Sequence, residues 1–299
     1  MAWRHVARLL FAAMLGIVAP ATEAAAAESP RVAVSISPLY SLIAGVMAGV
    51  GEPKLLIDGA ASPHAYVMRP SVARVLAAAD AVFWIGPDLE TFLPKLLGSL
   101  AGKARIITVM DEPEITLLPV RGGGAPGSFD PHVWLDPRNA RRIVSIASTT
   151  LSEIDPANAA AYRANAARLD RELSDLEREL AAKLAPARGV PFLVFHDAYS
   201  YFEARFGLTT IGAFALSPGT APGARRVAEL RARLVESGAA CVFVEPQFEP
   251  AVVKAAVAGT GARIAVLDPL GAGLPAGTAA YGQLMRNMAD NLLACLGDR

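Results

Sequence analysis

Short apolar runs alternate with amphipathic runs along most of the chain. The amphipathic runs have helical spacing, and Pro70 stands at the start of one of them, as it often does in the first turn of a helix. The runs with the composition of strands are residues 32–37, 54–58, 81–86, 105–109, 192–196, 208–214, 240–245 and 263–268, with a further extended piece at 132–136. The helical runs are residues 39–50, 71–80, 89–100, 138–154, 199–206, 222–237, 248–259 and 278–296. Strands that are apolar on both faces and separated by helices predict an α/β fold with mostly parallel sheets.

The pattern changes between residues 156 and 186. Apolar side chains recur there at steps of three and four, with charged residues between them: Tyr162, Ala166, Leu169, Leu173, Leu176, Leu180 and Leu184. This spacing predicts one long helix of roughly 40 Å at 1.5 Å per residue. A coiled-coil dimer is the alternative, but about three heptads bounded by prolines favour a helix that connects two lobes. We therefore expect an N-terminal lobe over 28–155, the connecting helix over 156–186 and a C-terminal lobe over 187–299.

The N-terminus has the features of a secretory signal. Arg4 and Arg8 precede an apolar run, Leu9 to Ala19, and small residues follow Pro20. The run is too short to span a bilayer, which takes about 20 residues. Since no cysteine lies near the expected cleavage point, a lipid anchor is disfavoured. We expect residues 1–27 to be removed and the mature protein to reside in the periplasm.

Composition removes several classes of function. The 299-residue chain has 28 Lys plus Arg and 28 Asp plus Glu, so it carries no basic field that would attract nucleic acid. It has no Gly-rich phosphate fingerprint after a strand and no GxSxG motif, so nucleotide binding and serine hydrolysis have no support. The Gly-rich stretch at 121–128 is expected to be a loop.

The only two cysteines are Cys241 and Cys295. In an oxidising compartment we expect them to form a disulfide, with two buried free thiols as the alternative. Such a bond would join the last helix to a strand of the second lobe.

Histidine is scarce, and the mature chain keeps three: His64, His132 and His196. His64 lies in a loop after the second strand, His132 follows the Gly-rich stretch, and His196 ends the strand "FLVFH". Asp268 ends its strand in the same way. Ligands of doubly wound sheets bind outside the carboxyl ends of the strands. These four residues therefore predict a site in the cleft between the lobes, although each histidine alone also fits a hydrogen-bonded loop residue.

Three neutral imidazoles and one carboxylate suit tetrahedral Zn²⁺, whereas manganese usually takes more oxygen ligands. Asp197 is a candidate either to orient the His196 ring or to cap the next helix. Glu245 is a candidate reserve ligand, a residue that orients a ligand, or a structural ion-pair partner. Asp130 and Asp136 are expected in a turn and a helix cap.

Six motifs in series resemble those of a known family: "SISPLYSLIAGVMAGVGEP", "ASPHAYVMRPS", "DPHVWLDPRNA", "FHDAYSYFEARFGL", "CVFVEPQF" and "VLDPLG". The likeness runs from Val32 to Leu296. It is to the metal-binding solute-binding proteins of bacterial ABC transporters, of the ZnuA/TroA type, and within them to the zinc-specific branch.

The resemblance implies two α/β lobes joined by one long rigid helix, with Zn²⁺ held between them. It implies His64, His132 and His196 as ligands and Asp268 as the carboxylate from the second lobe. A histidine at position 196, where manganese-selective relatives are expected to carry Glu, indicates zinc. It also implies the Cys241 to Cys295 disulfide. The expected function is capture of periplasmic Zn²⁺, as a monomer, for delivery to a membrane ABC permease.

Two departures from the family pattern bear on the site. Residues 112–130 contain no histidine, where many zinc members have a His-rich loop, which puts an auxiliary zinc site in doubt. Pro63 stands where some members have Glu before the first ligand, which favours Asp268 as the fourth ligand. The alternatives are the same fold carrying Mn²⁺ or Fe²⁺, and a zinc hydrolase with Glu245 as its base; we expect a non-enzyme.

Overall fold

The structure is a computed structural model. It describes residues 29–58, 61–121, 127–215, 223–248 and 251–297. The expected signal segment, 1–27, and most of the Gly-rich stretch at 121–128 lie outside the described residues. Within the described part of the chain, no helix combines the length and the apolar composition needed to cross a membrane.

Two four-stranded parallel sheets form the centres of two lobes, as the apolar strand pattern predicts. The first sheet has the order β2-β1-β3-β4, and the second has the order β6-β5-β7-β8. The strands of the first are β1 (Val32–Val34), β2 (Lys54–Leu55), β3 (Ala81–Trp84) and β4 (Arg105–Thr108). Those of the second are β5 (Pro191–His196), β6 (Thr209–Ala215), β7 (Cys241–Val244) and β8 (Arg263–Val266). In the central pairs, Val32 is in register with Ala81 and Leu193 with Val242.

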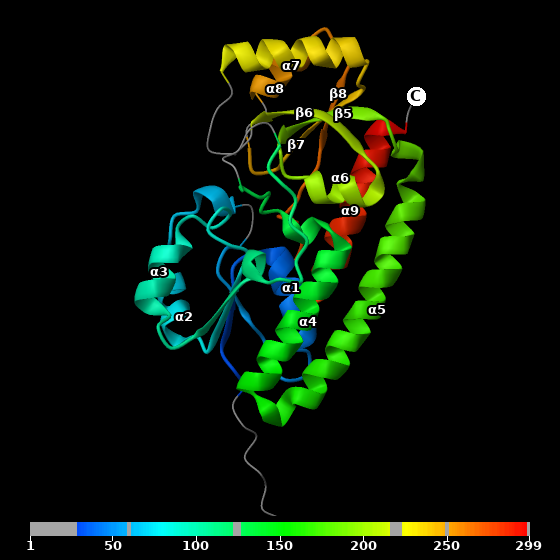
Figure 1. Ribbon diagram of the computed structural model, residues 1–299. Coiled ribbons are helices and arrows are strands. Elements are labelled where there is room, and N and C mark those ends of the chain that lie inside the picture. The colour runs from blue at the N-terminus through cyan, green and yellow to red at the C-terminus, as the bar shows by residue number, and fades with distance from the viewer. Residues whose placement is uncertain (1–28, 59–60, 122–126, 216–222, 249–250, 298–299) are drawn as a thin grey trace, which may run out of the picture.

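Helices flank both sheets, with the second lobe above the first in Figure 1. The helices of the first lobe are α1 (Ser37–Val46), α2 (Pro70–Ala78), α3 (Leu93–Leu100) and α4 (Pro137–Ile154). Those that follow are α5 (Ala159–Lys183), α6 (Ser200–Phe206), α7 (Ala224–Ser237), α8 (Ala251–Val257) and α9 (Ala280–Leu296). The fold class expected from the sequence, two α/β lobes with parallel sheets, is confirmed.

Helix α5 is the predicted long helix. It has 25 residues, about 38 Å at 1.5 Å per residue, and runs from the base of the first lobe to the second lobe (Figure 1). A short 3₁₀ turn (Pro156–Asn158) precedes it. The stripe of leucines that suggested a coiled coil is buried within the single chain, where α5 packs against α4, α1 and α9.

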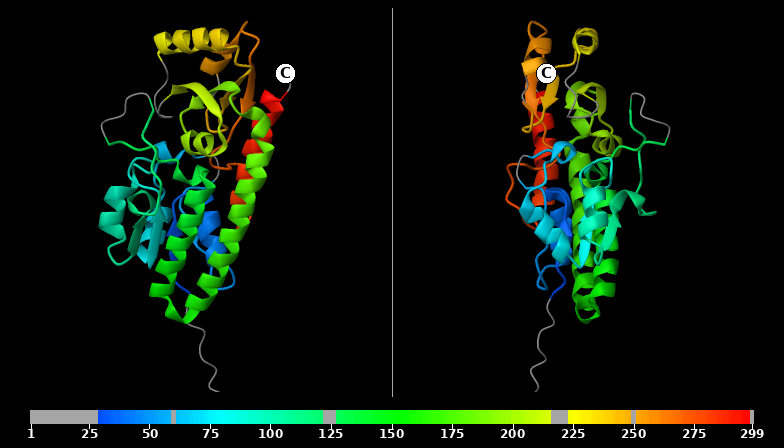
Figure 2. Two further views of the ribbon diagram at one scale, coloured as in Figure 1. Left: turned by 45° about the vertical axis from the view of Figure 1, so that its right-hand side comes forward. Right: turned by 90° about the vertical axis from the view of Figure 1, so that its left-hand side faces the viewer.

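Helix α9 also joins the lobes. Figures 1 and 2 show it extending from beside α1 of the first lobe up to the second lobe. At the start of α9, the backbone N–H of Tyr281 donates to the Ser41 hydroxyl (2.9 Å), and Ser41 donates to the carbonyl of Thr278 (3.1 Å). At its other end, Cys295 is disulfide-bonded to Cys241 of β7, which confirms the expected pairing.

One apolar core continues from the first lobe across the boundary into the second. Phe83 in the first lobe, Leu173 in α5 and Phe202 in α6 all belong to it. A second, smaller cluster fills the space beneath α7 and α8. Because separating the lobes would expose part of the shared core to water, the fold favours local adjustments over wide opening.

One expected strand is a helical turn instead. Residues 132–136 were predicted to be extended, but Val133–Leu135 form a 3₁₀ turn that leads into α4. The carboxylate of Asp136 accepts the backbone N–H of Arg138 (2.9 Å), and Pro137 occupies the first helical turn, so Asp136 is the expected cap. A capped helix start directly after the turn leaves no room for a strand.

Candidate metal centre

Three histidines from different segments meet where the two lobes face each other. His64 lies in a 3₁₀ turn (Pro63–Ala65) after β2, His132 precedes the turn into α4, and His196 is the last residue of β5. One ring nitrogen from each lies within 4.8 Å of the others. The Nε2 atoms of His64 and His132 are 3.4 Å apart, and the ring centroids of His132 and His196 are 4.9 Å apart. The structure thus brings these three histidines together.

Hydrogen bonds behind the rings set their tautomers. The Nδ1 atom of His132 lies 2.6 Å from Oδ1 of Asp130, and Nδ1 of His196 lies 3.1 Å from Oε1 of Glu245. A carboxylate only accepts, so each Nδ1 carries the proton and each Nε2 presents a lone pair. His64 makes its hydrogen bond with the backbone of Asp88. The tautomers inferred for His132 and His196 therefore leave both Nε2 atoms free to bind an ion.

The inward nitrogen of His196 lacks an ordinary partner. His196 Nε2 is buried and has no hydrogen-bond partner among the described residues. Burial, and then the neighbouring rings of His132 and His196, lower the pKa of His64 to about 2. The His64 ring is therefore neutral at pH 7, and no second proton occupies the space between the rings. A buried acceptor without a donor is costly, and a cation bound to it removes that cost.

The carboxylate behind His132 is held in its charged form. Burial opposes ionisation of Asp130. The His132 ring and the hydrogen bonds that the Asp130 carboxylate accepts nevertheless keep the pKa of Asp130 below its usual range. Oδ1 of Asp130 also accepts the backbone N–H of His132 (3.0 Å). Asp130 was expected only as a turn residue, and the Asp-x-His spacing was the signal for its second role.

Two cavities adjoin the three histidines. One of ≈ 10 Å³ is lined by all three rings, with Trp134, Glu245 and Leu270 among its other walls. This volume holds about one water molecule, which is enough for a single small ion. The other, of ≈ 250 Å³, also reaches all three histidines and includes Asp88, Arg121 and Asp197 in its lining.

The structure places Asp268 beside this group but does not bring it into the cluster of three. Its Oδ1 accepts backbone N–H groups from Leu270 (2.9 Å) and Gly271 (3.0 Å) and the Gln247 amide (3.3 Å). Its Oδ2 accepts the N–H of Ala272 (2.6 Å). The Asp268 carboxylate thus fixes the loop that contributes Leu270 to the small cavity.

Asp197 has neither of its expected roles. The ring of His196 is hydrogen-bonded to Glu245 instead, and α6 begins without a side-chain cap. Asp197 is paired with Arg121, a residue that the sequence patterns did not single out. Glu245 is therefore the partner that orients His196.

Other interlobe contacts surround the site. The indole N–H of Trp134 donates to the carbonyl of Pro269 (2.8 Å). Arg205 of α6 pairs with both oxygens of Asp136, with N to O distances of 2.8 and 2.6 Å. The hydroxyl of Tyr201 donates to the carbonyl of Asp130 (2.8 Å). The segment that carries His132 is thus fixed to the second lobe.

Fold and site together define a two-lobed α/β protein with a candidate cation site between its lobes. A model of the family described as "Zinc-uptake complex component A periplasmic" (ZnuA) matches residues 32–295. The chain belongs to this family.

Comparisons with individual proteins agree. The chain is 41% identical over 310 residues to the high-affinity zinc uptake system protein ZnuA of Brucella abortus (strain 2308), covering 91% of this chain and 93% of the relative. It is 34% identical to the protein of the same name from Paracoccus denitrificans, covering 97% and 98%. A crystal structure of ZnuA matches with a TM-score of 0.77 at 27% identity, covering 88% of this chain and 99% of that one. A zinc-bound ZnuA lacking residues 138–173 of its own numbering gives a TM-score of 0.78 at 27% identity, with 90% and 98% covered.

Proposed function

We propose that this protein captures Zn²⁺ in the periplasm and delivers it to a membrane ABC permease. The observation that carries the proposal is the convergence of one ring nitrogen from each of three histidines on a cavity of ≈ 10 Å³. Nitrogen donors suit Zn²⁺, while Mn²⁺ takes mostly oxygen ligands. The names of the relatives, zinc uptake system proteins, support the same cargo.

His64, His132 and His196 are the proposed ligands, two from the first lobe and one from the second. Asp268 is the proposed fourth ligand. Its Oδ2 accepts one hydrogen bond from a described residue and so retains a lone pair, and its neighbours Pro269 and Leu270 line the small cavity. A shift of this loop that brings Oδ2 of Asp268 to the three histidine nitrogens would complete a tetrahedral shell.

A closed shell of four protein ligands leaves no position for a reactive water. Catalytic zinc sites keep such a position open, so this arrangement supports binding and transport rather than hydrolysis. Since the apolar stripe of α5 is buried within one chain, the proposed working form is a monomer. The proposed compartment is the periplasm, reached through cleavage of the signal segment at 1–27.

Zinc binding is tested with the mature protein after chelator treatment and dialysis. Titration in competition with a chromophoric chelator gives the zinc affinity, and parallel titrations with Mn²⁺ test the cargo. His64→Ala is expected to weaken zinc binding at least 100-fold, because one of three nitrogen donors is lost. Val67→Ala, a change at an 82% exposed side chain near His64, is the matched control and should bind as the wild type does.

Two results would contradict the proposal. One is a wild-type protein that regains no zinc, and the other is equal affinity in the His64→Ala variant. For the fourth ligand, Asp268→Asn is compared with Asp111→Asn, which removes an exposed charge from the same chain. If only Asp268→Asn loses zinc affinity, Asp268 is supported as the fourth ligand. If both variants bind zinc equally well, Asp268 is excluded as a ligand. Metal analysis of protein isolated directly from the periplasm then tests the cargo in its native compartment.

A further inference from the structure

Arg121 crosses the boundary between the lobes next to the candidate metal centre. It lies on a first-lobe hairpin in which Pro119 and Phe129 form an antiparallel bridge. In the same hairpin the backbone N–H of Asp130 donates to the carbonyl of Leu118 (2.9 Å). The hairpin therefore carries both Arg121 and Asp130, the carboxylate that orients His132.

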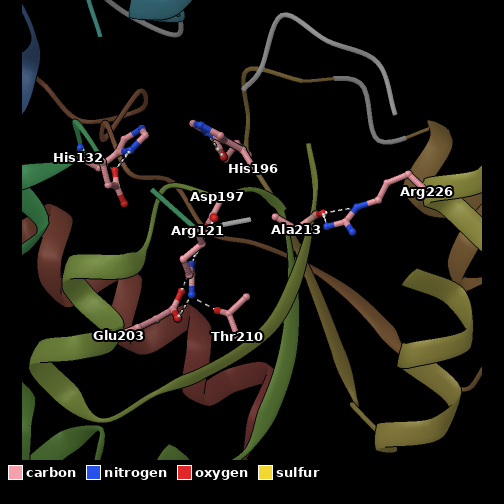
Figure 3. Close-up of polar contacts among 10 residues, drawn as sticks. Arg121, His132, His196, Asp197, Glu203, Thr210, Ala213 and Arg226 are labelled. Atoms are coloured by element: carbon pink, nitrogen blue, oxygen red, sulfur yellow. Dashed lines mark hydrogen bonds and ion pairs between the residues drawn. The ribbon is translucent and has the colours of Figure 1, made fainter. Parts of the chain in front are cut away.

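Two acidic side chains of the second lobe accept hydrogen bonds from the guanidinium group of Arg121 (Figure 3). Asp197 follows His196 directly, and Arg121 Nε lies 3.0 and 3.2 Å from its two carboxylate oxygens. Glu203 belongs to α6, and its oxygens lie 2.6 Å from Nη1 and 3.1 Å from Nη2 of Arg121. Thr210 of β6 donates a further hydrogen bond to Glu203 (2.6 Å). We call Arg121, Asp197 and Glu203 the interlobe clamp.

The clamp is largely shielded from water on its acidic side. The side chains of Asp197 and Glu203 are only 9% and 8% exposed, and that of Arg121 is 37% exposed. Burial works against the charged form of the arginine, but Glu203 and Asp197 raise the pKa of Arg121 above its ordinary value. Without Arg121, two nearly buried carboxylates would face each other unpaired, and removing one partner of such a group is strongly destabilising.

The position of the clamp connects it to metal exchange. Arg121 and Asp197 line the ≈ 250 Å³ cavity that reaches His64, His132 and His196. A bound ion would link the same two lobes across the same boundary, because the histidines come from both. The clamp and the ion therefore favour the same arrangement of the lobes, and each stabilises the state in which the other is engaged.

We propose that Arg121 is a positioning residue for metal capture: by pairing with Asp197 and Glu203, it holds the hairpin that carries Asp130 against the segment that carries His196, and so slows loss of the bound ion. This inference rests on the proposed capture of zinc. Arg121 does not touch the ion and acts through the segments that carry two of the ligands. Its loss should therefore raise the dissociation rate of zinc more than it lowers the association rate.

The test is the rate of zinc release from the loaded mature protein into excess chelator, measured by stopped flow. Arg121→Gln is expected to release zinc at least fivefold faster than the wild type, and Arg121→Lys, which keeps the charge without the bidentate geometry, should fall between them. The matched control is Arg286→Gln, which removes an ion pair between α9 and Glu179 of α5 away from the site (N to O 2.8 Å). This control should release zinc within twofold of the wild-type rate.

Asp197→Asn provides an independent variant that weakens the same clamp from the other lobe, and it should also accelerate release. The proposal is overturned if Arg121→Gln and Asp197→Asn release zinc at the wild-type rate. It is also overturned if Arg286→Gln accelerates release as much as they do, because the effect would then be general destabilisation. A wild-type protein that takes up no zinc at all would instead refute the proposed function, so the two failures are distinct.

Discussion

The carboxylate behind His132 offers a quantitative test of the site. Asp130→Asn keeps the shape of the side chain but removes the charge that accepts the Nδ1 proton of His132 at 2.6 Å. The Asp130 and His132 side chains are both at most 5% exposed, so water does not replace the lost interaction. Removing the partner of a metal-bound histidine typically costs 10- to 100-fold in affinity. We therefore expect zinc binding to weaken by that factor, which is about 1.4 to 2.7 kcal/mol.

Glu245→Gln gives an internal comparison. Its contact with His196 is longer, at 3.1 Å, so the loss of zinc affinity should be smaller than for Asp130→Asn. The affinities are measured by chelator competition at pH 7.5, with Asp111→Asn as the control for loss of an acidic charge, expected to bind within twofold of the wild type. Circular dichroism of the metal-free variants checks that they are folded. Zinc affinity within twofold of the wild type in Asp130→Asn would refute the reasoning.

Two further predictions concern stability rather than binding. Glu90 is fully buried, and burial raises its pKa from 4.5 to about 7 despite hydrogen bonds from the backbone N–H groups of Gly86 and Ile85. The folded protein thus binds this proton more tightly than the unfolded chain, so stability should fall by on the order of 3 kcal/mol as the pH rises from about 4.5 to above 7. Glu90→Gln should remove that part of the pH dependence in urea unfolding of the metal-free protein, and equal pH slopes would contradict the assignment. Replacing both Cys241 and Cys295 by Ser should lower the unfolding free energy by about 4 kcal/mol for a loop of this length. Zinc affinity should stay unchanged, since Cys241 is at the opposite end of its strand from the site, about 13 Å from Glu245 at 3.3 Å per residue; a large loss of affinity would show that the disulfide also shapes the site.

The sequence was sufficient for the architecture and for the three histidines. Apolar runs such as "AVFW" and "CVFV" are fully buried strands, and their continuous apolar character indicated parallel sheets covered on both faces. Because the carboxyl ends of parallel strands share one edge, the sequence predicts that His64 and His196 lie at the edges where the two lobes face each other. The long helix followed from its leucine spacing.

The partners of polar side chains were not predictable in the same way. Arg121 and Asp197 are separated by 76 residues and lie on different lobes, so their pairing depends on how the lobes pack. The same holds for Glu245, 49 residues from His196. Local patterns carry periodicity and capping, but they carry no information about which of several acidic residues a distant ring will face.

The small cavity between the three rings has a kinetic consequence. A space of ≈ 10 Å³ has room for about one water-sized particle, whereas an ion with its hydration shell carries several water molecules. An incoming ion must therefore exchange its water molecules for imidazole nitrogens, one after another, as it moves out of the wider cavity. Mg²⁺ gives up its water reluctantly, so the narrowness of the site alone discriminates against this ion before any difference in binding strength acts.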